Sequence, residues 1–196
     1  PNTRTRQQAR MRLGLDEEAF LFLLLGLVRP YKGQEELLPA FSALTGPRLR
    51  LVIAGQPASP DYALRLRSLA GTDGRITLDL RFVPSEEVQI YFNAANVCVL
   101  PYRQITTSGA ALLSLSFGVP IVAPAIGAFP NLIAGNRGIL YPPGDAGALS
   151  RALDEARQRD WTGARADNIG WVAQFRWEEI GRQLLAAYFE PPAFDG

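Results

Sequence analysis

The chain has 196 residues, of which 47% are hydrophobic, enough for one well-cored domain that buries roughly 70% of its unfolded surface. Its 20 Lys and Arg residues against 19 Asp and Glu leave a net charge of +1. This balance argues against nucleic acid and anionic membranes as partners, because both are bound through excess basic charge. The single cysteine, Cys98, excludes an internal disulfide and is expected to be a buried thiol, and the lack of histidine excludes common metal and general-base arrangements.

No apolar run is long enough for a transmembrane helix, and no signal peptide opens the chain. Apolar runs instead alternate with amphipathic segments, which predicts an α/β fold with a Rossmann-like, doubly wound parallel sheet. Strands are predicted at residues 20–25, 49–54, 76–82, 97–100, 120–123 and 138–140, with 76–82 at an edge. Helices are predicted at 34–44, 60–69, from 85 onward, 109–117, 145–159 and 180–189, with Ser59, Ser85, Ser108 and Asp145 as caps.

The first candidate site is the loop at residues 26–33, between the first strand and its helix. It begins with Gly26 and carries the cations Arg29 and Lys32 beside Gly33. Ligands of open α/β sheets bind at the carboxyl ends of the strands, where helix amino termini also attract anions. The loop therefore predicts a phosphate site; the alternative is that both cations are solvated loop charges.

The second candidate loop, residues 101–109, follows the strand at 97–100 and leads into a helix of small residues. Thr106, Thr107 and Ser108 supply hydroxyl groups, and Gly109 lets backbone N–H groups approach a ligand closely. The loop predicts a second wall of the phosphate site, with an ordinary Ser/Thr helix cap as the alternative. A third loop at 125–130, which contains Gly127, either lies against a base or sugar or simply turns the chain.

Six short motifs occur in an order that resembles a known family. They are Gly26 to Gly33, Ile-Ala-Gly at 53–55, Tyr-Phe-Asn-Ala-Ala-Asn-Val at 91–97, Leu-Pro-Tyr at 100–102, Gly-Val-Pro-Ile-Val-Ala at 118–123 and Gly-Ile-Leu at 138–140. Together they resemble the carboxy-terminal, donor-binding half of a GT-B glycosyltransferase of family 4, also called glycosyl transferases group 1. The resemblance implies an interdomain connection at 1–19, a nucleotide-sugar-binding Rossmann-like domain at 20–174, and a terminal helix at 175–196 that packs toward an absent amino-terminal domain.

The resemblance also implies roles for single residues. Lys32 matches the family lysine that contacts the donor diphosphate, whereas Leu27 replaces the family arginine, so Arg29 is expected to serve instead. Three positions that are commonly acidic in the family carry Ile105, Leu113 and Asn131 here. Recognition of the ribose and the sugar must therefore be rebuilt or absent.

The leading hypothesis is a metal-independent, retaining glycosyltransferase that needs no cofactor and takes a nucleotide-diphosphate sugar as donor. Its catalytic residues are not identified; Lys32 and Arg29 would give electrostatic support. A sugar or lipid-linked acceptor would be held by the absent domain, so we expect this fragment alone to be inactive. The implied setting is polysaccharide biosynthesis in the cytoplasm, at the inner membrane surface. The alternatives are a degenerate, non-catalytic nucleotide- or partner-binding GT-B domain, and an unrelated α/β phospho-ligand or structural domain that shares only the fold.

Overall fold

The predicted parallel sheet is present. The computed structural model describes residues 2–145 and 147–189, and in this part six strands form one parallel sheet in the order β3-β2-β1-β4-β5-β6. The strands are β1 (Phe20–Leu25), β2 (Leu49–Ala54), β3 (Ile76–Asp79), β4 (Val97–Val99), β5 (Ile121–Pro124) and β6 (Gly138–Tyr141). The helices are α1 (Arg6–Arg12), α2 (Gln34–Ser42), α3 (Pro60–Ala70), α4 (Ser85–Ala94), α5 (Gly109–Ser116), α6 (Phe129–Leu132), α7 (Ala148–Gln158), α8 (Ala164–Val172) and α9 (Trp177–Phe189).

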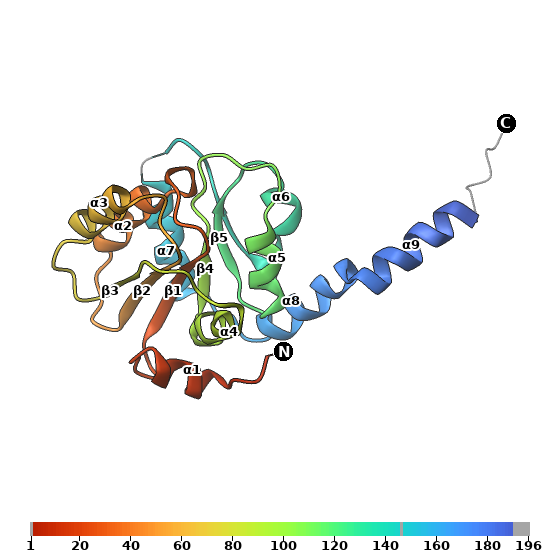
Figure 1. The fold of residues 1–196 in the computed structure, drawn as a ribbon, viewed down its shortest axis with the longest axis horizontal. Helices are drawn as coiled ribbons and strands as arrows, with labels where there is room; N and C mark the ends of the chain where they lie inside the picture. The colour runs from red at the N-terminus through yellow and green to blue at the C-terminus, as the bar shows by residue number, and fades with distance from the viewer. Residues whose placement is uncertain (1, 146, 190–196) are drawn as a thin grey trace.

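The central strand β1 is buried on both faces, as its continuous apolar sequence predicts. Phe22 and Leu24 belong to the core shared with α2, α3 and α7. Leu21, Leu23 and Leu25 belong to the opposite core, beneath α1, α4, α5 and α8. The sheet is therefore covered by helices on both sides (Figure 1), with a separate hydrophobic core on each face.

The strand order places a topological switch point between β1 and β4. From β1 the chain moves outward through β2 to β3, and it then returns to place β4 on the other side of β1. The connections that leave the carboxyl ends of β1 and β4 therefore run to opposite faces of the sheet: the first leads to α2 and the second to α5. Such a divergence opens a crevice at this edge of the sheet, where ligands of doubly wound folds bind.

The edge strand β3 is shorter than the predicted segment 76–82. It ends at Asp79 because the Arg81 N–H donates to the Asp79 carbonyl at 3.0 Å, and this turn takes the chain out of the sheet. Phe82 consequently lies outside the strand and is 69% exposed. Most other predicted elements exist with bounds that move by one to three residues.

Two predicted helix caps are wrong. Ser85 is the first helical residue of α4 rather than its cap, because Pro84 already holds the extended backbone of the cap position. Asp145 does not cap α7, whose cap position is Gly147. The Asp145 carboxylate instead accepts a hydrogen bond from the Gly147 N–H at 2.8 Å, which closes a turn just before the helix. Ser59 and Ser108 cap α3 and α5 as predicted.

Helices α1, α6 and α8 were not predicted. Helix α1 packs on α4 and helix α8 packs on α5, so both extend the same face of the sheet. At the other end of the chain α9 projects away from the sheet and its helices (Figure 1), with Trp177 84% and Phe189 79% exposed. Residue 1 and residues 190–196 of the predicted terminal segments lie outside the described part. No helix in the described ranges has the length and apolar character needed to cross a bilayer.

Candidate functional site

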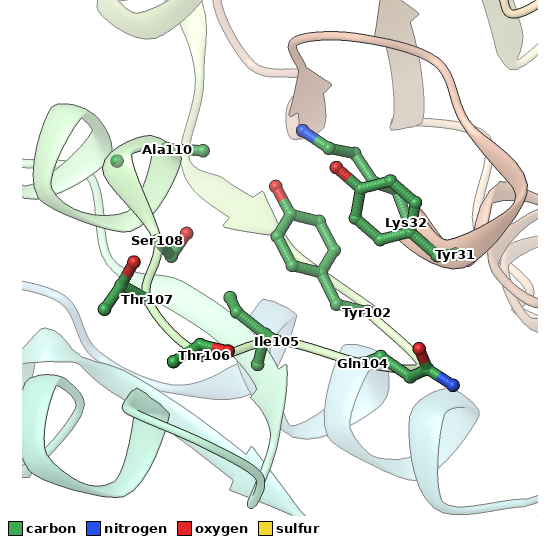
Figure 2. Close-up of a pocket in the computed structure, with 10 residues that line it drawn as sticks. Tyr31, Lys32, Tyr102, Gln104, Ile105, Thr106, Thr107, Ser108 and Ala110 are labelled. Atoms are coloured by element: carbon green, nitrogen blue, oxygen red, sulfur yellow. The ribbon is translucent and has the colours of Figure 1, made fainter.

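A cleft of about 680 Å³ lies where the loops that follow β1 and β4 diverge. One wall comes from the 3-10 turn Pro30–Lys32, and the other from the loop and helix start after β4. Figure 2 shows these two walls facing each other. The lining residues are Tyr31, Lys32, Tyr102, Gln104, Ile105, Thr106, Thr107, Ser108, Gly109 and Ala110.

The two walls are held together by backbone contacts. Gly33 has a φ of +74°, and a Cβ at this position would lie 1.9 Å from the Pro101 carbonyl oxygen, so only glycine fits. The Arg103 N–H donates to the Tyr31 carbonyl at 2.8 Å. The Arg103 guanidinium also donates to Glu36 on α2 at 2.5 Å. The position of one wall therefore determines the position of the other.

Lys32 is the cation of the cleft and the single lysine of the chain. Its Nζ lies 5.1 Å from the centre of the Tyr102 ring, a cation–π distance. Burial, together with the nearby charge of Arg29, lowers the pKa of Lys32 from its ordinary value. Among the described residues no carboxylate forms an ion pair with it. A partly desolvated cation without a protein counterion favours an anionic ligand.

The glycine that begins the first loop lies next to this cation. A Cβ on Gly26 would lie 3.4 Å from Lys32 Nζ. Gly26 also lies against the neighbouring loop, because a Cβ on Gly55 would come within 1.8 Å of the Gly26 carbonyl oxygen. Gly55 therefore allows the loops that follow β1 and β2 to lie in close contact.

The amino terminus of α5 forms the wall opposite Lys32. Ser108 caps the helix, with its Oγ accepting from the Ala111 N–H at 3.1 Å. The cap interpretation is therefore correct for this serine. Thr107 is exposed and lines the cleft beside Gly109, which opens the helix. The first N–H groups of a helix have no acceptor within it and carry partial positive charge, so this wall also favours an anion.

Three predicted site residues, Gly26, Arg29 and Gly127, do not line the cleft. Arg29 is half-buried, and its Nη1 lies 3.4 Å from the Val28 carbonyl oxygen, so its side chain turns back along its own loop. Gly127 supports the cleft from behind: its φ is +51°, and a Cβ there would lie 2.3 Å from the Ile105 carbonyl oxygen. Gly127 thus lets the third loop pack against the second.

The three positions that are commonly acidic in the resembling family lie at different places. Ile105 lines the cleft and gives it an apolar patch. Leu113 is 40% exposed on α5 and does not line the cleft. Asn131 is exposed on α6. Only the first of these positions faces the cleft, so restoring an acid there would place it at the site directly.

The loops were predicted, but the aromatic side chains in them were not recognised as site residues. Tyr31 and Tyr102 both line the cleft, with ring centres 6.3 Å apart. A tyrosine in the loop that follows a buried strand is the signal that could have identified Tyr102. Cys98, in β4 below them, is a buried thiol as predicted, and burial raises its pKa to about 12, which leaves it protonated and unreactive.

The family model of glycosyl transferases group 1 matches residues 19–158. The chain belongs to this family. It is 34% identical over 178 residues to the GDP-mannose:glycolipid 4-beta-D-mannosyltransferase of Xanthomonas campestris pv. campestris, a match that covers 89% of this chain and 50% of that protein. The chain thus spans about half the length of this curated relative.

Solved structures of glycosyl transferases share the fold. Sucrose-phosphate synthase from Thermosynechococcus elongatus superposes with a TM-score of 0.74 at 26% identity, over 96% of this chain and 51% of that one. The C-terminal domain of a group 1 family protein, LpcC of Francisella tularensis, superposes with a TM-score of 0.71 at 20% identity, over 89% of this chain and 94% of that domain. The described fold is that of the carboxy-terminal half of a GT-B glycosyltransferase.

Proposed function

We propose that the chain is the donor-binding half of a glycosyltransferase, and that its cleft holds the diphosphate of a nucleotide-diphosphate sugar. The observation that carries the proposal is the position of Lys32, which faces the amino terminus of α5 across the switch point of the sheet. A diphosphate bound there meets the Lys32 ammonium on one side and the backbone N–H groups of the helix start on the other. Both are preferred partners of phosphate oxygens.

The same groups suit a transfer reaction without a metal ion. When the bond between the anomeric carbon and the diphosphate oxygen breaks, negative charge grows on the departing nucleoside diphosphate. Lys32 and the helix start at Ser108 and Gly109 would stabilise this charge electrostatically. Arg29 adds positive charge behind the lysine. Retention of the anomeric configuration remains part of the proposal, because it rests on the resemblance to family 4.

The donor and the acceptor are proposed from the name of the mannosyltransferase relative, and the site of the acceptor from the two ends of the chain. The mannosyltransferase relative makes GDP-mannose the first donor to test, and a glycolipid the first acceptor. We propose that residues 1–19 connect this domain to an amino-terminal half that binds the acceptor at the inner membrane surface. Helix α9 would then lie against that half, which would cover exposed apolar side chains of the helix such as Trp177 and Leu184, now 84% and 60% exposed.

Calorimetric titration of the chain with GDP, UDP, ADP and dTDP tests the binding step. We expect saturable binding of one nucleotide, and a loss of about 10- to 100-fold in affinity for Lys32→Ala, since a charge-assisted hydrogen bond contributes about 1.5–3 kcal/mol. Arg29→Ala should lose less, because Arg29 does not line the cleft. Arg48→Ala, an exposed arginine just before β2, is the matched control and should bind like the parent chain.

One observation favours a second candidate, the degenerate domain that binds without transfer. Ile105 brings an apolar side chain to the cleft where the family commonly has an acid. Sugar transfer by the longer protein that contains this half, measured with GDP-mannose, separates the two candidates. Nucleotide binding without any transfer would favour the degenerate domain. A folded chain that binds none of the four nucleotides would contradict the diphosphate site itself.

A further inference from the structure

The hydroxyl of Tyr102 is a buried polar group without a partner. The residue is only 5% exposed, yet its Oη has no hydrogen-bond partner within residues 2–145 and 147–189. Figure 2 shows this hydroxyl pointing into the cleft, between Lys32 and Ser108. The Ser108 side chain lies on the opposite wall of the same cleft. Buried hydroxyl groups are almost always hydrogen-bonded, so this one requires an explanation.

The position of Tyr102 distinguishes it from the other unpaired groups. In the described part of the chain two further buried side-chain atoms lack a partner, Gln34 Nε2 and Asn168 Oδ1, and neither residue lines the cleft. The Tyr102 ring packs against Phe129, with ring centres 5.8 Å apart. A phenylalanine would make the same ring contacts and would leave no polar atom unpaired. The hydroxyl therefore contributes nothing to packing that the ring does not already supply.

We propose that Tyr102 is a substrate-binding residue whose hydroxyl donates a hydrogen bond to the diphosphate of the sugar nucleotide. This inference rests on the proposed function and deepens it by naming a third donor between the lysine and the helix terminus. The ligand is recognised by its phosphate oxygens, because the groups on either side of the hydroxyl, the Lys32 ammonium and the start of α5, both attract anions.

The surroundings keep this hydroxyl in its donor form. Burial raises the pKa of Tyr102 well above its usual range, so the phenol holds its proton at neutral pH. The Lys32 Nζ lies 5.1 Å from the centre of the same ring, which fixes the two donors relative to each other. A bound phosphate oxygen would pair the hydroxyl that is unpaired in the free chain.

The test compares two tyrosine-to-phenylalanine variants of the same chain. Tyr102→Phe removes the proposed donor. Tyr62→Phe removes a hydroxyl that is also buried but donates to Gln34 Oε1 at 3.2 Å, away from the cleft lining. Thermal melting, calorimetry with GDP, and ligand-observed NMR with guanosine are recorded for both variants and for the parent chain. The NMR measurement tolerates the weak affinity expected of a nucleoside.

For Tyr102→Phe we expect GDP binding about 10-fold weaker or more, guanosine binding within about twofold of the parent chain, and a melting temperature at least as high as that of the parent chain. Tyr62→Phe should melt lower and bind GDP like the parent chain. A combination of weaker diphosphate binding and undiminished stability cannot come from a merely structural role.

The alternative outcomes are distinct. If the parent chain binds GDP and Tyr102→Phe binds it equally well, the role of Tyr102 is refuted while the diphosphate site stands. If guanosine and GDP weaken by the same factor, the hydroxyl does not act on the phosphates and the inference is overturned. If the folded parent chain binds no nucleoside diphosphate, both the inference and the proposed function fail.

Discussion

Replacing the buried arginine of α1 should strongly destabilise the domain. Arg10 is 1% exposed and makes five hydrogen bonds to oxygen atoms of two separate segments, residues 16–19 and 94–96. Two of these acceptors are buried backbone carbonyls, Ala94 at 3.2 Å and Ala19 at 2.8 Å. Arg10→Met introduces an unbranched apolar side chain that fills part of the same space but leaves both carbonyls unpaired, at a cost of about 1–3 kcal/mol each. The expected loss in the free energy of unfolding is therefore about 2–6 kcal/mol.

Denaturant unfolding followed by circular dichroism measures this loss. The matched control is Arg12→Met, which makes the same chemical change at an exposed position of the same helix and should stay within about 0.5 kcal/mol of the parent chain. A loss below about 1 kcal/mol for Arg10→Met would refute the reasoning, because it would show that water or a backbone shift satisfies the two carbonyls. Equal losses in both variants would assign the effect to the helix rather than to the buried hydrogen bonds.

Two further predictions concern the first wall of the cleft. Gly33→Ala should lower the free energy of unfolding by more than about 2 kcal/mol and weaken GDP binding. The control is Gly14→Ala, at a φ of +65° with no atom within 4 Å of the new Cβ, where backbone strain alone should lower the free energy of unfolding by about 1–2 kcal/mol. Equal losses in the two variants would contradict the contact with Pro101. The pKa of Lys32, measured by NMR of the ¹³C-methylated chain, should lie below the ordinary lysine value of about 10.4, because burial disfavours the ammonium. GDP affinity should then fall as the pH rises through that pKa, and an unshifted titration would refute the desolvation of the cleft.

The core of the fold could be predicted because its signals are local and strong. The run at 20–25 is apolar at every position, so the central strand is recognisable whichever face each side chain takes. Helix α8 was missed because its signal is weaker: Asn168 is fully buried and its Nδ2 donates to the Gly118 carbonyl at 3.3 Å. Because a polar residue occupies this buried position, the sequence of α8 lacks the apolar periodicity that would predict a helix.

The packing of the amino-terminal segment, residues 1–19, was not predicted for a similar reason. Arg10 reads as a surface charge in the sequence, whereas its guanidinium is buried among oxygens that lie up to 86 residues away. Asn96 joins this arrangement, because its Oδ1 accepts from both Arg10 and the Leu21 N–H, at 2.8 and 2.9 Å. A buried arginine of this kind depends on contacts between distant segments, and these are invisible to local pattern and composition.

The site was predicted as loops rather than as side chains. Strand ends and helix starts identified both walls, because parallel topology alone brings the loops after β1 and β4 to one crevice. Which side chains turn inward depends on rotamers and packing. Arg29 and Lys32 lie three residues apart in one loop, yet only the lysine lines the cleft. Tyr102 could not be ranked above the hydroxyls of its own loop until its burial was known.

Three departures from ordinary stability rules lie together at this cleft. Gly33 adopts a left-handed backbone, Lys32 is a cation desolvated without a counterion, and the Tyr102 hydroxyl is buried without a partner. Each of the last two costs the free chain stability that an apolar residue would recover. A bound diphosphate would satisfy both groups at once, which explains why they lie beside each other in one cleft. A domain that only holds its fold has no physical reason to combine them, and this clustering favours ligand binding over a purely structural role.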